Sequence, residues 1–372
     1  MTGSPTSADL DRARPTIGIV GAGAMGAGIA QVALEAGSEV VLHDVDPAAI
    51  DRARETIRNG LEPRAAQLDL DADSIDEWAG GRLERLREAH TLDGIAEEAE
   101  LVVEAALEDL GLKREIFRAL DSGAPTDTIL ASNTSAISIG DIASATAHPE
   151  RVLGLHFFNP VPRMDLVEVV PGPATSPDVV TRAEDVVRTW GKTPIRSADS
   201  PGFIVNRVNR PFTIEALRLL EAGEASVEAI DKAMRDADFP MGPFELMDLT
   251  GIDVTLAAAR GVWEGLGRPD RLRPSDIQEG LVAEGRLGRK TGGGFYDYVE
   301  ARRGPVAAQF RLAAGESSMP AADIEADILA AIADEARRAL ADGVATEADI
   351  DLALRLGAGH PVGPFERRAA DG

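Results

Sequence analysis

Residues 16–36 read TIGIVGAGAMGAGIAQVALEA and predict a strand, a glycine-rich turn and a helix in immediate succession. Thr16–Val20 is a short apolar run, which is typical of a buried strand, and Ala24–Ala36 is composed mainly of small and apolar residues, which favour a closely packed helix. The turn, Gly21-Ala22-Gly23-Ala24-Met25-Gly26, matches the pattern G-x-G-x-x-G. Gly21 would allow the tight turn, Gly23 would let the backbone approach a ligand, and Gly26 would let helix and strand pack closely.

The surroundings of this turn favour a dinucleotide as the ligand. Because 37 of the 372 residues are glycine, the pattern alone is weak evidence and its context matters more. Glu39–His43 predicts a second strand, and Asp44 stands at its end, where a carboxylate can accept hydrogen bonds from both ribose hydroxyls. The next residues, Val45 and Asp46, offer no cation to a 2′-phosphate, so NAD is favoured over NADP. The alternative is a glycine-rich turn that binds another ligand.

The rest of the first half continues the alternation of strands and helices. Further apolar runs predict strands over Leu101–Glu104, Thr128–Ala131, Val152–His156, Leu166–Val170 and Thr193–Arg196. Helical stretches lie between them, which favours a parallel sheet covered by helices. Residues 50–90 interrupt this rhythm, are strongly charged and predict a helical pair. The strands stop at Ser200-Pro201, so we expect a domain boundary near residue 199 and a helical domain beyond it.

The last part of the chain contains an internal repeat. Residues 215–245 (EALRLLEAGEASVEAIDKAMRDADFPMGPFE) align with residues 335–366 (EARRALADGVATEADIDLALRLGAGHPVGPFE), with one residue of slack. Similarity over this length predicts a partial second copy of the helical domain. The expected organisation is a flexible tail (1–14), an α/β domain (15–199, with the 50–90 insertion), a helical domain (200–298) and its partial repeat (299–372).

Composition limits the classes of partner. With 38 basic and 63 acidic residues the net charge is −25, so the surface would repel nucleic acids and anionic membranes. The absence of cysteine excludes disulfides, thiolate metal sites and cysteine nucleophiles, and we expect no metal. No apolar run is long enough to span a bilayer and residues 1–14 lack the apolar core of a secretory signal, so we expect a cytoplasmic protein.

The cations themselves are unusual, because only four of them are lysine: Lys113, Lys192, Lys232 and Lys290. An acidic surface in which arginine replaces nearly all lysine fits a cytosol rich in salt, which predicts a halophilic source. The alternative is a GC-rich bacterium whose composition is biased towards arginine and alanine.

His156 and Glu168 are the leading catalytic candidates. His156 ends one apolar run, and ligands bind at the carboxyl ends of parallel strands. Glu168 lies inside the apolar run Leu166–Val170, where a lone carboxylate is expensive to bury and needs a partner. A His–Glu pair would fix the orientation and tautomer of the imidazole. The alternative is a structural ion pair.

Two further polar groups stand where strands or domains meet. Ser132-Asn133-Thr134-Ser135 follows a predicted strand, so its hydroxyls would lie at the same edge of the sheet as His156. Asn206 lies at the start of the helical domain, where it is either a functional amide or an ordinary residue of a helix surface.

Seven motifs together resemble the L-3-hydroxyacyl-CoA dehydrogenase (3-hydroxybutyryl-CoA dehydrogenase-like) family. In chain order they are GAGAMGAGIAQ, VVEAALEDLGLKREIF, ASNTSAISI, GLHFFNPVPRMDLVEVV, SPGFIVNRV, MGPFELMDLTGID and GRKTGGGFYDY. The resemblance runs from about Thr16 to Tyr298. It implies a Rossmann-type NAD-binding domain followed by an all-α, 6-phosphogluconate-dehydrogenase-like domain, and the NAD-dependent oxidation of (S)-3-hydroxyacyl-CoA in β-oxidation or short-chain acyl-CoA metabolism.

The resemblance also assigns roles to residues. It implies that His156 is the catalytic base and Glu168 its partner, and that Ser135 and Asn206 hold the substrate oxygen. The cofactor set that it implies is Gly21, Gly23, Ala24, Met25, Gly26, Asp44, Glu108, Lys113 and Ser135.

Two departures from the family pattern keep other functions open. The 50–90 segment contacts CoA in the family, and here it has no lysine, so a free 3-hydroxy acid (an L-gulonate 3-dehydrogenase-like activity) is the first alternative. A non-catalytic NAD-binding or structural protein is the second. In the repeat, Ala326 stands at the position of Asn206 and Asp327 at that of Arg207, so we expect the second copy to be structural. It would make the protein a pseudo-dimeric monomer, with a homodimer as the alternative.

Overall fold

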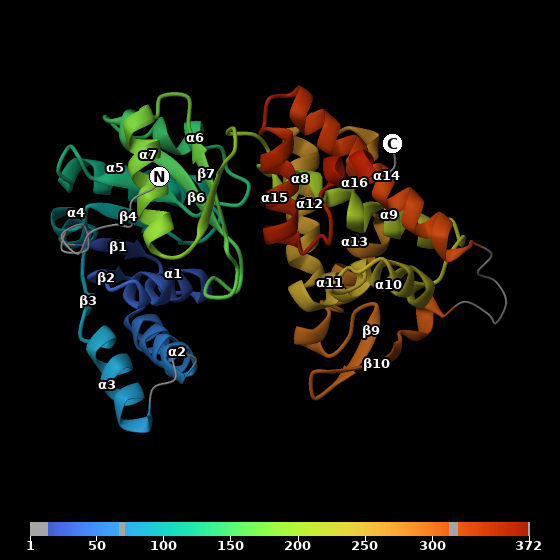
Figure 1. Cartoon of the computed structure of the whole chain (residues 1–372), viewed down its shortest axis with the longest axis horizontal. Helices are drawn as coiled ribbons and strands as arrows, with labels where there is room; N and C mark the ends of the chain where they lie inside the picture. The colour runs from blue at the N-terminus through green and yellow to red at the C-terminus, as the bar shows by residue number, and fades with distance from the viewer. Residues whose placement is uncertain (1–13, 67–70, 312–318, 371–372) are drawn as a thin grey trace. The chain divides into compact units, whose positions relative to one another are not determined.

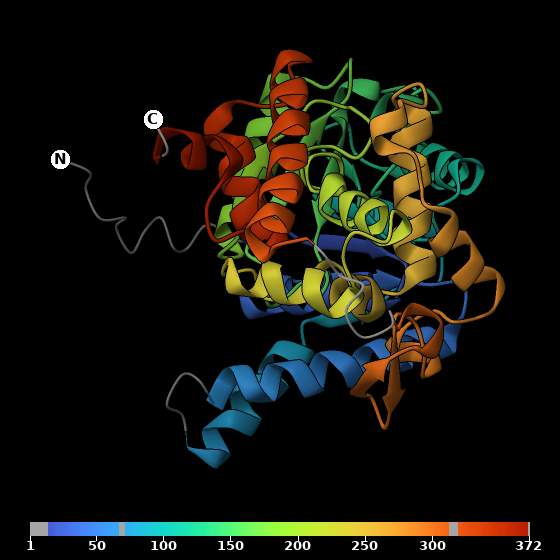
Figure 2. The same ribbon diagram turned by 90° about the vertical axis from the view of Figure 1, so that its right-hand side faces the viewer.

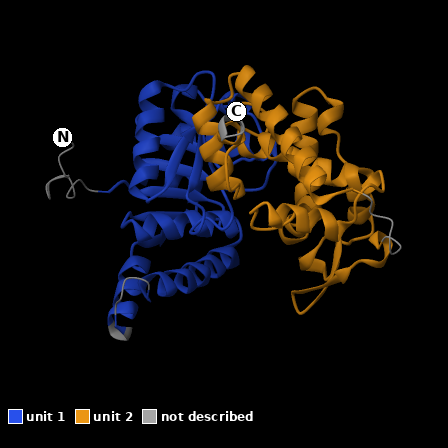
Figure 3. Ribbon diagram, turned by 45° about the vertical axis from the view of Figure 1, so that its right-hand side comes forward, with its two compact units in different colours: residues 1–199 blue, residues 200–372 orange. Residues whose placement is uncertain are grey.

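An eight-stranded sheet organises the first of two units into which the chain divides, residues 1–199 and 200–372 (Figure 3). The computed structural model describes residues 14–66, 71–311 and 319–370. In spatial order the strands are β3 (Leu86–Glu88), β2 (Val40–His43), β1 (Ile17–Val20), β4 (Leu101–Glu104), β5 (Ile129–Ser132), β6 (Val152–Phe157), β7 (Leu166–Pro171) and β8 (Thr193–Arg196).

The expectation of a parallel sheet is wrong for its last two strands. The strands from β3 to β6 run parallel, but β7 pairs antiparallel with β6, and β8 runs parallel to β7. The reason is the connection between β6 and β7, residues 158–165, because a parallel crossover needs about a dozen residues or more. The reversal sets His156 directly opposite Glu168 in the register.

Helices cover both faces of this sheet (Figure 1). One core cluster joins the helices α1 (Ala24–Glu35), α2 (Pro47–Ala66) and α7 (Pro177–Thr189) to one face of the strands. The other face meets α4 (Leu92–Glu98) and α6 (Ile139–Ala143), and α5 (Leu110–Gly123) packs on both of these helices. Ile95 of α4 lies against Gly18, where a Cβ would collide with it. The Rossmann-type architecture that the sequence predicts is confirmed.

The 50–90 segment contains the expected pair of helices. α2 packs against α3 (Ala72–Leu83), as Figures 1 and 2 show, and the chain then returns to the sheet as the short edge strand β3. The buried residues of α2, among them Ile50, Ile57 and Leu61, follow the helical period and face the core. The charged face of α2 is left to solvent and to α3.

The second unit is mostly helical. Its helices are α8 (Val205–Val208), α9 (Arg210–Glu221), α10 (Val227–Asp236), α11 (Pro243–Thr250), α12 (Ile252–Gly265), α13 (Asp276–Ala283), α14 (Ala321–Ala341), α15 (Glu347–Ala358) and α16 (Pro364–Ala370). No helix of the described residues is long and apolar enough to cross a membrane.

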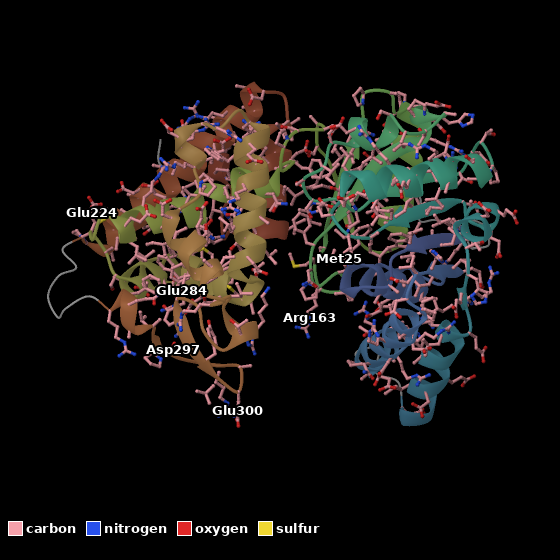
Figure 4. The ribbon with its side chains drawn as sticks, turned by 180° about the vertical axis from the view of Figure 1, so that it is seen from behind. Met25, Arg163, Glu224, Glu284, Asp297 and Glu300 are labelled. Atoms are coloured by element: carbon pink, nitrogen blue, oxygen red, sulfur yellow. The ribbon has the colours of Figure 1, made fainter. Side chains whose placement is uncertain are left out.

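A hairpin corrects the expectation that this unit is all-α. Strands β9 (Tyr296–Val299) and β10 (Arg302–Val306) pair antiparallel, and Figure 4 marks Asp297 on β9 and Glu300 at the tip. Buried Asp248 of α11 accepts hydrogen bonds from the backbone N–H groups of Phe295 and Tyr296, each at 2.9 Å. One carboxylate therefore ties the start of the hairpin to the helices.

The two copies of the repeat share their local geometry. In the first copy, Asp231 accepts a hydrogen bond from the N–H of Phe244 at 2.9 Å, and in the second, Asp351 accepts one from Phe365 at the same distance. The same one-way cap follows each aspartate, since the N–H of Gly242 donates to Glu245 and the N–H of Gly363 donates to Glu366. The repeated sequence is thus a repeated structure.

The second copy packs on the first within this unit. Helix α14 lies against α8, α9 and α10. Buried Arg207 of α8 donates to Glu335 of α14 at 2.8 Å, and Arg271 donates to the same carboxylate at 2.6 Å. The ring of His360 meets that of Phe239 at 4.9 Å between centroids. His360 and Phe239 occupy equivalent positions in the two copies.

Candidate active site

Two side chains on neighbouring strands form the centre of the candidate site. The imidazole of His156 on β6 lies with Nδ1 at 2.6 Å from Oε2 of Glu168 on β7. The side chain of His156 is 5% exposed and that of Glu168 is fully buried. A carboxylate only accepts hydrogen bonds, so Nδ1 carries the proton and Nε2 keeps its lone pair in the neutral ring. The arrangement is that of an oriented general base.

A serine occupies the other side of the imidazole. Ser135 lies in the loop after β5, and its Oγ is 3.1 Å from Nε2 of His156. The side chain of Asn133 in the same loop accepts a hydrogen bond from the N–H of Phe157 at 2.9 Å, which ties the loop to the end of β6. The exposed hydroxyl of Ser135 therefore stands beside the nitrogen that can accept a proton.

A buried network of charged side chains contacts this loop and holds it in place. Lys113 on α5 is 1% exposed and donates to Oε1 of fully buried Glu104 at 2.7 Å, and its Nζ lies 3.4 Å from Glu108. One oxygen of Glu108 accepts hydrogen bonds from the hydroxyl of Thr134 at 2.6 Å and from the N–H of Ser135 at 3.0 Å. Glu108 and Lys113 are thus part of the framework that holds the serine loop.

Glu104 is a member of this network that the sequence analysis did not select. It ends β4, and its second oxygen accepts a hydrogen bond from the hydroxyl of Ser132 at 2.7 Å. The available signal was the same as for Glu168, because Glu104 is a lone carboxylate among apolar residues. Its partner Lys113 lies nine residues further along the chain, on α5.

The glycine turn has the geometry of a pyrophosphate site. Gly21 has φ +103°, which favours glycine, and a Cβ on Gly26 would collide with the carbonyl oxygen of Gly21. A Cβ on Gly23 would meet nothing within 4 Å, so the backbone there faces open space. Helix α1 begins at this turn without a side-chain cap and without an acidic residue in its first turn, and its free N–H groups can bind an anion.

The remaining cofactor candidates lie around this turn. Asp44 follows β2, and its Oδ2 accepts a hydrogen bond from the N–H of Ala22 at 2.7 Å. Val45 and Leu107 follow β2 and β4, the two strands that flank β1, and they are 93% and 77% exposed. Met25 packs partly on the core from α1 (Figure 4). The turn thus has an anchored carboxylate and two exposed apolar side chains beside it, a suitable setting for an adenosine.

Asn206, the fourth catalytic candidate, belongs to the second unit. It is half-buried and lies on α8, next to the buried Arg207. The structure therefore brings together His156, Glu168 and Ser135 within the first unit and sets Asn206 in the first helix of the second. The described residues contain no cluster of three or more His, Asp or Glu side chains that could hold a metal ion.

The fold and this site together define an NAD-dependent dehydrogenase. Comparison with known proteins makes the assignment specific. The model of the 3-hydroxyacyl-CoA dehydrogenase NAD-binding domain matches residues 16–200, and the model of the C-terminal domain of the same family matches residues 202–298 and 324–368. The chain belongs to the 3-hydroxyacyl-CoA dehydrogenase family. NAD as the cofactor and the resemblance found in the sequence are thereby confirmed.

Known relatives of this chain carry related names. The 3-hydroxyadipyl-CoA dehydrogenase of Escherichia coli is 45% identical over 292 residues, which cover 78% of this chain and 60% of that protein. The mitochondrial hydroxyacyl-coenzyme A dehydrogenase of Rattus norvegicus is 44% identical over 283 residues, 75% of this chain and 90% of that protein. A solved structure of 3-hydroxybutyryl-CoA dehydrogenase from Escherichia coli superposes with a TM-score of 0.85 at 36% identity, covering 96% of this chain and 92% of that one.

Proposed function

We propose that this protein catalyses the reversible NAD-dependent oxidation of a (S)-3-hydroxyacyl-CoA to the 3-ketoacyl-CoA, with His156 as general base. The observation that carries the proposal is the chain of contacts from Glu168 through His156 to Ser135. The names of the relatives supply the substrate class, and they differ in the acyl group.

The proton is handled by His156. Its Nε2 accepts the proton of the 3-hydroxyl, while bound NAD supplies the acceptor for the hydride that leaves C3. Glu168 stabilises the imidazolium that forms, because its carboxylate is buried and already bonded to Nδ1. Ser135 and Asn206 hold the C3 oxygen and so restrict the substrate to a reactive geometry.

The cofactor is held by residues of the first unit. Gly23, Ala24 and Met25 at the N-terminus of α1 would hold the pyrophosphate, and Asp44 would accept hydrogen bonds from the adenosine ribose. Val45 and Leu107 would contact the adenine, and this role would account for their exposure in a protein that buries most of its large apolar side chains. Glu108 and Lys113 would lie near the nicotinamide ribose, and Glu108 positions the loop of Ser135 through its hydrogen bond from the N–H of Ser135.

The second copy of the helical domain has a structural role in this proposal. Its Ala326 replaces the amide of Asn206, and its contacts with the first copy are ion pairs and apolar packing. One chain therefore carries one catalytic site.

A free 3-hydroxy acid is the competing substrate, because residues 50–90 contain no lysine to meet CoA phosphates. One observation favours the CoA ester over the free acid. A cavity of about 430 Å³ between α2 and α3 is lined by the cations Arg54 and Arg58. It is also lined by three carboxylates, Glu62, Asp76 and Glu84. The two arginines offer cations to the CoA on the helices that contact it in the family.

The deciding experiment follows NADH absorbance with acetoacetyl-CoA and, in the oxidative direction, with free 3-hydroxy acids. We expect turnover of the CoA ester and a kcat/KM for the free acids that is lower by orders of magnitude. Turnover of free acids alone would reject the acyl-CoA assignment, and NAD binding without turnover of either class would reject the enzyme.

A further inference from the structure

A buried lysine lies directly before β8. Lys192 is 8% exposed, and its Nζ donates to the carbonyl oxygen of Val161 at 2.8 Å and to that of Met164 at 2.9 Å. Both carbonyls belong to the connection between β6 and β7, residues 158–165, on which Figure 4 labels Arg163. The ammonium group therefore binds the backbone of this connection at two points.

The burial of this cation is unfavourable for the stability of the fold. Burial lowers the pKa of Lys192, and the charges of Asp165 and Glu35 offset this effect only in part. An exposed lysine such as Lys232 instead forms an ion pair, with Asp236. A cation that leaves water and meets neutral carbonyl groups gains less than it would from a carboxylate. Its place in the fold is therefore better explained by what it holds than by the stability that it adds.

The choice of lysine is itself informative in a chain whose cations are nearly all arginine. Lys113 and Lys192 are two of its four lysines, and both are buried. Lys113 belongs to the network through which Glu108 holds the loop of Ser135. A compact ammonium group can donate to two converging carbonyls, whereas the planar fork of a guanidinium suits a carboxylate. Each of these two lysines thus supports one of the segments that flank His156.

The connection between β6 and β7 passes its position on to the imidazole. The ring of Phe158 meets the ring of His156 at 4.6 Å between centroids. Val161 is 2% exposed, and a Cβ on Gly28 of α1 would lie only 2.9 Å from its Cβ, so the connection also fits closely on the helix of the glycine turn. The segment held by the ammonium group therefore joins the two strands of the His–Glu pair, touches the imidazole and rests on α1.

We propose that Lys192 is a positioning residue, which fixes the connection between β6 and β7 so that the imidazole of His156 keeps the orientation required for proton transfer. This inference rests on the proposed function, in which His156 is the general base. Lys192 acts through the two backbone carbonyls and not by contact with substrate or cofactor. Their release would let the ring of Phe158 shift against the imidazole, and a misplacement of about 1 Å can lower a rate about 10²-fold.

The first measurement is the reduction of acetoacetyl-CoA by NADH in Lys192→Met, which keeps the length of the side chain and removes its donors. We expect kcat to fall about 10- to 10²-fold. The KM for NADH stays within a few-fold of the wild type, because the glycine turn and Asp44 lie on other elements. Lys192→Arg, which keeps a charged donor of different shape, recovers part of the loss.

The second measurement separates positioning of the base from general structural support. Lys192→Met is combined with His156→Gln, and kcat of the double variant is compared with that of His156→Gln alone. If Lys192 acts through the imidazole, it lowers kcat in this background by no more than a few-fold, because residues that act as a unit are not additive. The control is Lys232→Met, which removes an exposed lysine of α10 and leaves kcat unchanged in both backgrounds.

Other outcomes overturn the inference and leave the proposed function intact. A kcat of Lys192→Met equal to that of the wild type rejects the role, and the same loss in both backgrounds assigns Lys192 to structural support. A higher KM for NADH with an unchanged kcat assigns it to cofactor binding. If Lys192→Met shows no cooperative melting transition, Lys192→Arg takes its place in the same comparison. Absence of turnover by the wild type rejects the proposed function itself.

Discussion

At the scale of single residues, the proposal depends on the nitrogen of His156 that faces Ser135. The substitution His156→Gln keeps a polar side chain of similar reach and removes the base. We expect kcat to fall about 10²–10⁴-fold, which is the usual contribution of a general base, in a protein that remains folded. Initial rates of NADH formation measure the effect.

The control for this prediction is His90→Gln, because the side chain of His90 is 87% exposed and belongs to no network of the site. A kcat of His156→Gln within a few-fold of the wild type would remove His156 from the mechanism.

Some residues of this site could be predicted from the sequence and others could not. His156 and Glu168 could be paired in advance, because each interrupts an apolar run and a buried carboxylate needs a partner. Glu104 is likewise a lone carboxylate in an apolar run, but the sequence did not identify its partner. Lys113 lies on α5, and only the structure shows that its side chain is buried and faces Glu104.

At the scale of elements, the strand–turn–helix of residues 17–35 was predictable because its constraints are local. Gly21 is required by its positive φ and by the backbone of Ala105 on the neighbouring strand's end, and Gly26 by the carbonyl oxygen of Gly21 in the same turn. The direction of β7 was not anticipated, although the short connection after β6 contained the information. The hairpin β9–β10 depends on the buried carboxylate of Asp248, far away in the sequence, and its second strand, RRGPV, lacks an apolar alternation.

The junction of α10, α11 and the hairpin makes stability depend on pH. Burial raises the pKa of Asp231 from 3.8 to about 7, which hydrogen bonds from Tyr296 and Phe244 and the charges of Arg235 and Arg303 offset only in part. Between about pH 4 and pH 7 the folded protein therefore binds more protons at this group than the unfolded chain does. The contribution of Asp231 to stability is present at the acid end of this window and is lost as the pH rises.

The substitution Asp231→Asn tests this dependence, because asparagine can accept from Phe244 and donate to Tyr296. We expect the melting temperature to depend less steeply on pH between 4 and 7, with a difference in unfolding free energy of a few kcal/mol at most across the window. The matched variant is Asp253→Asn. Burial acts to raise the pKa of Asp253, but its hydrogen bond with Lys290, the backbone hydrogen bond from Val254 and the charge of Lys290 together lower it. The contribution of Asp253 to stability is therefore lost only below about pH 4, and this variant leaves the slope between pH 4 and 7 nearly unchanged. Identical slopes in both variants would contradict the assignment.

At the scale of the whole molecule, the repeat predicted from the sequence relates two segments of the second unit, residues 215–245 and residues 335–366. Its recognition required only the alignment of 215–245 with 335–366, but the packing of one copy on the other required coordinates. The ion pair between Arg207 and Glu335 joins positions that no periodicity relates.

Removal of residues 320–372 tests the role of the second copy. The truncated chain loses Glu335 as the partner of buried Arg207 and exposes the faces of α8, α9 and α10 that α14 covers. We expect association or aggregation, measured by light scattering after size-exclusion chromatography. A truncated chain that remains soluble with the unchanged assembly state of the full protein would contradict the structural role of the tail.

The net charge of −25 predicts a response to salt. Both NAD and an acyl-CoA are anions, so their capture is slow at low ionic strength and faster when the field is screened. The Debye length falls from about 10 Å at 0.1 M to about 3 Å at 1 M. If the protein is halophilic, both kcat/KM and the melting temperature rise between 0.1 and 1 M KCl. Optima of activity and stability at low salt would favour the compositional bias of a GC-rich genome instead.

Phe239 and His360 belong to different copies of the repeat, and their contact bears on how the association of the two copies depends on protein concentration. Two separate copies of a helical domain would associate with a dissociation constant, and dilution would part them. Here both copies belong to one polypeptide, so each meets the other at a local concentration fixed by the connecting chain. The helical unit keeps its partner at any protein concentration, and the melting of this unit is expected to be the same in dilute and concentrated solutions.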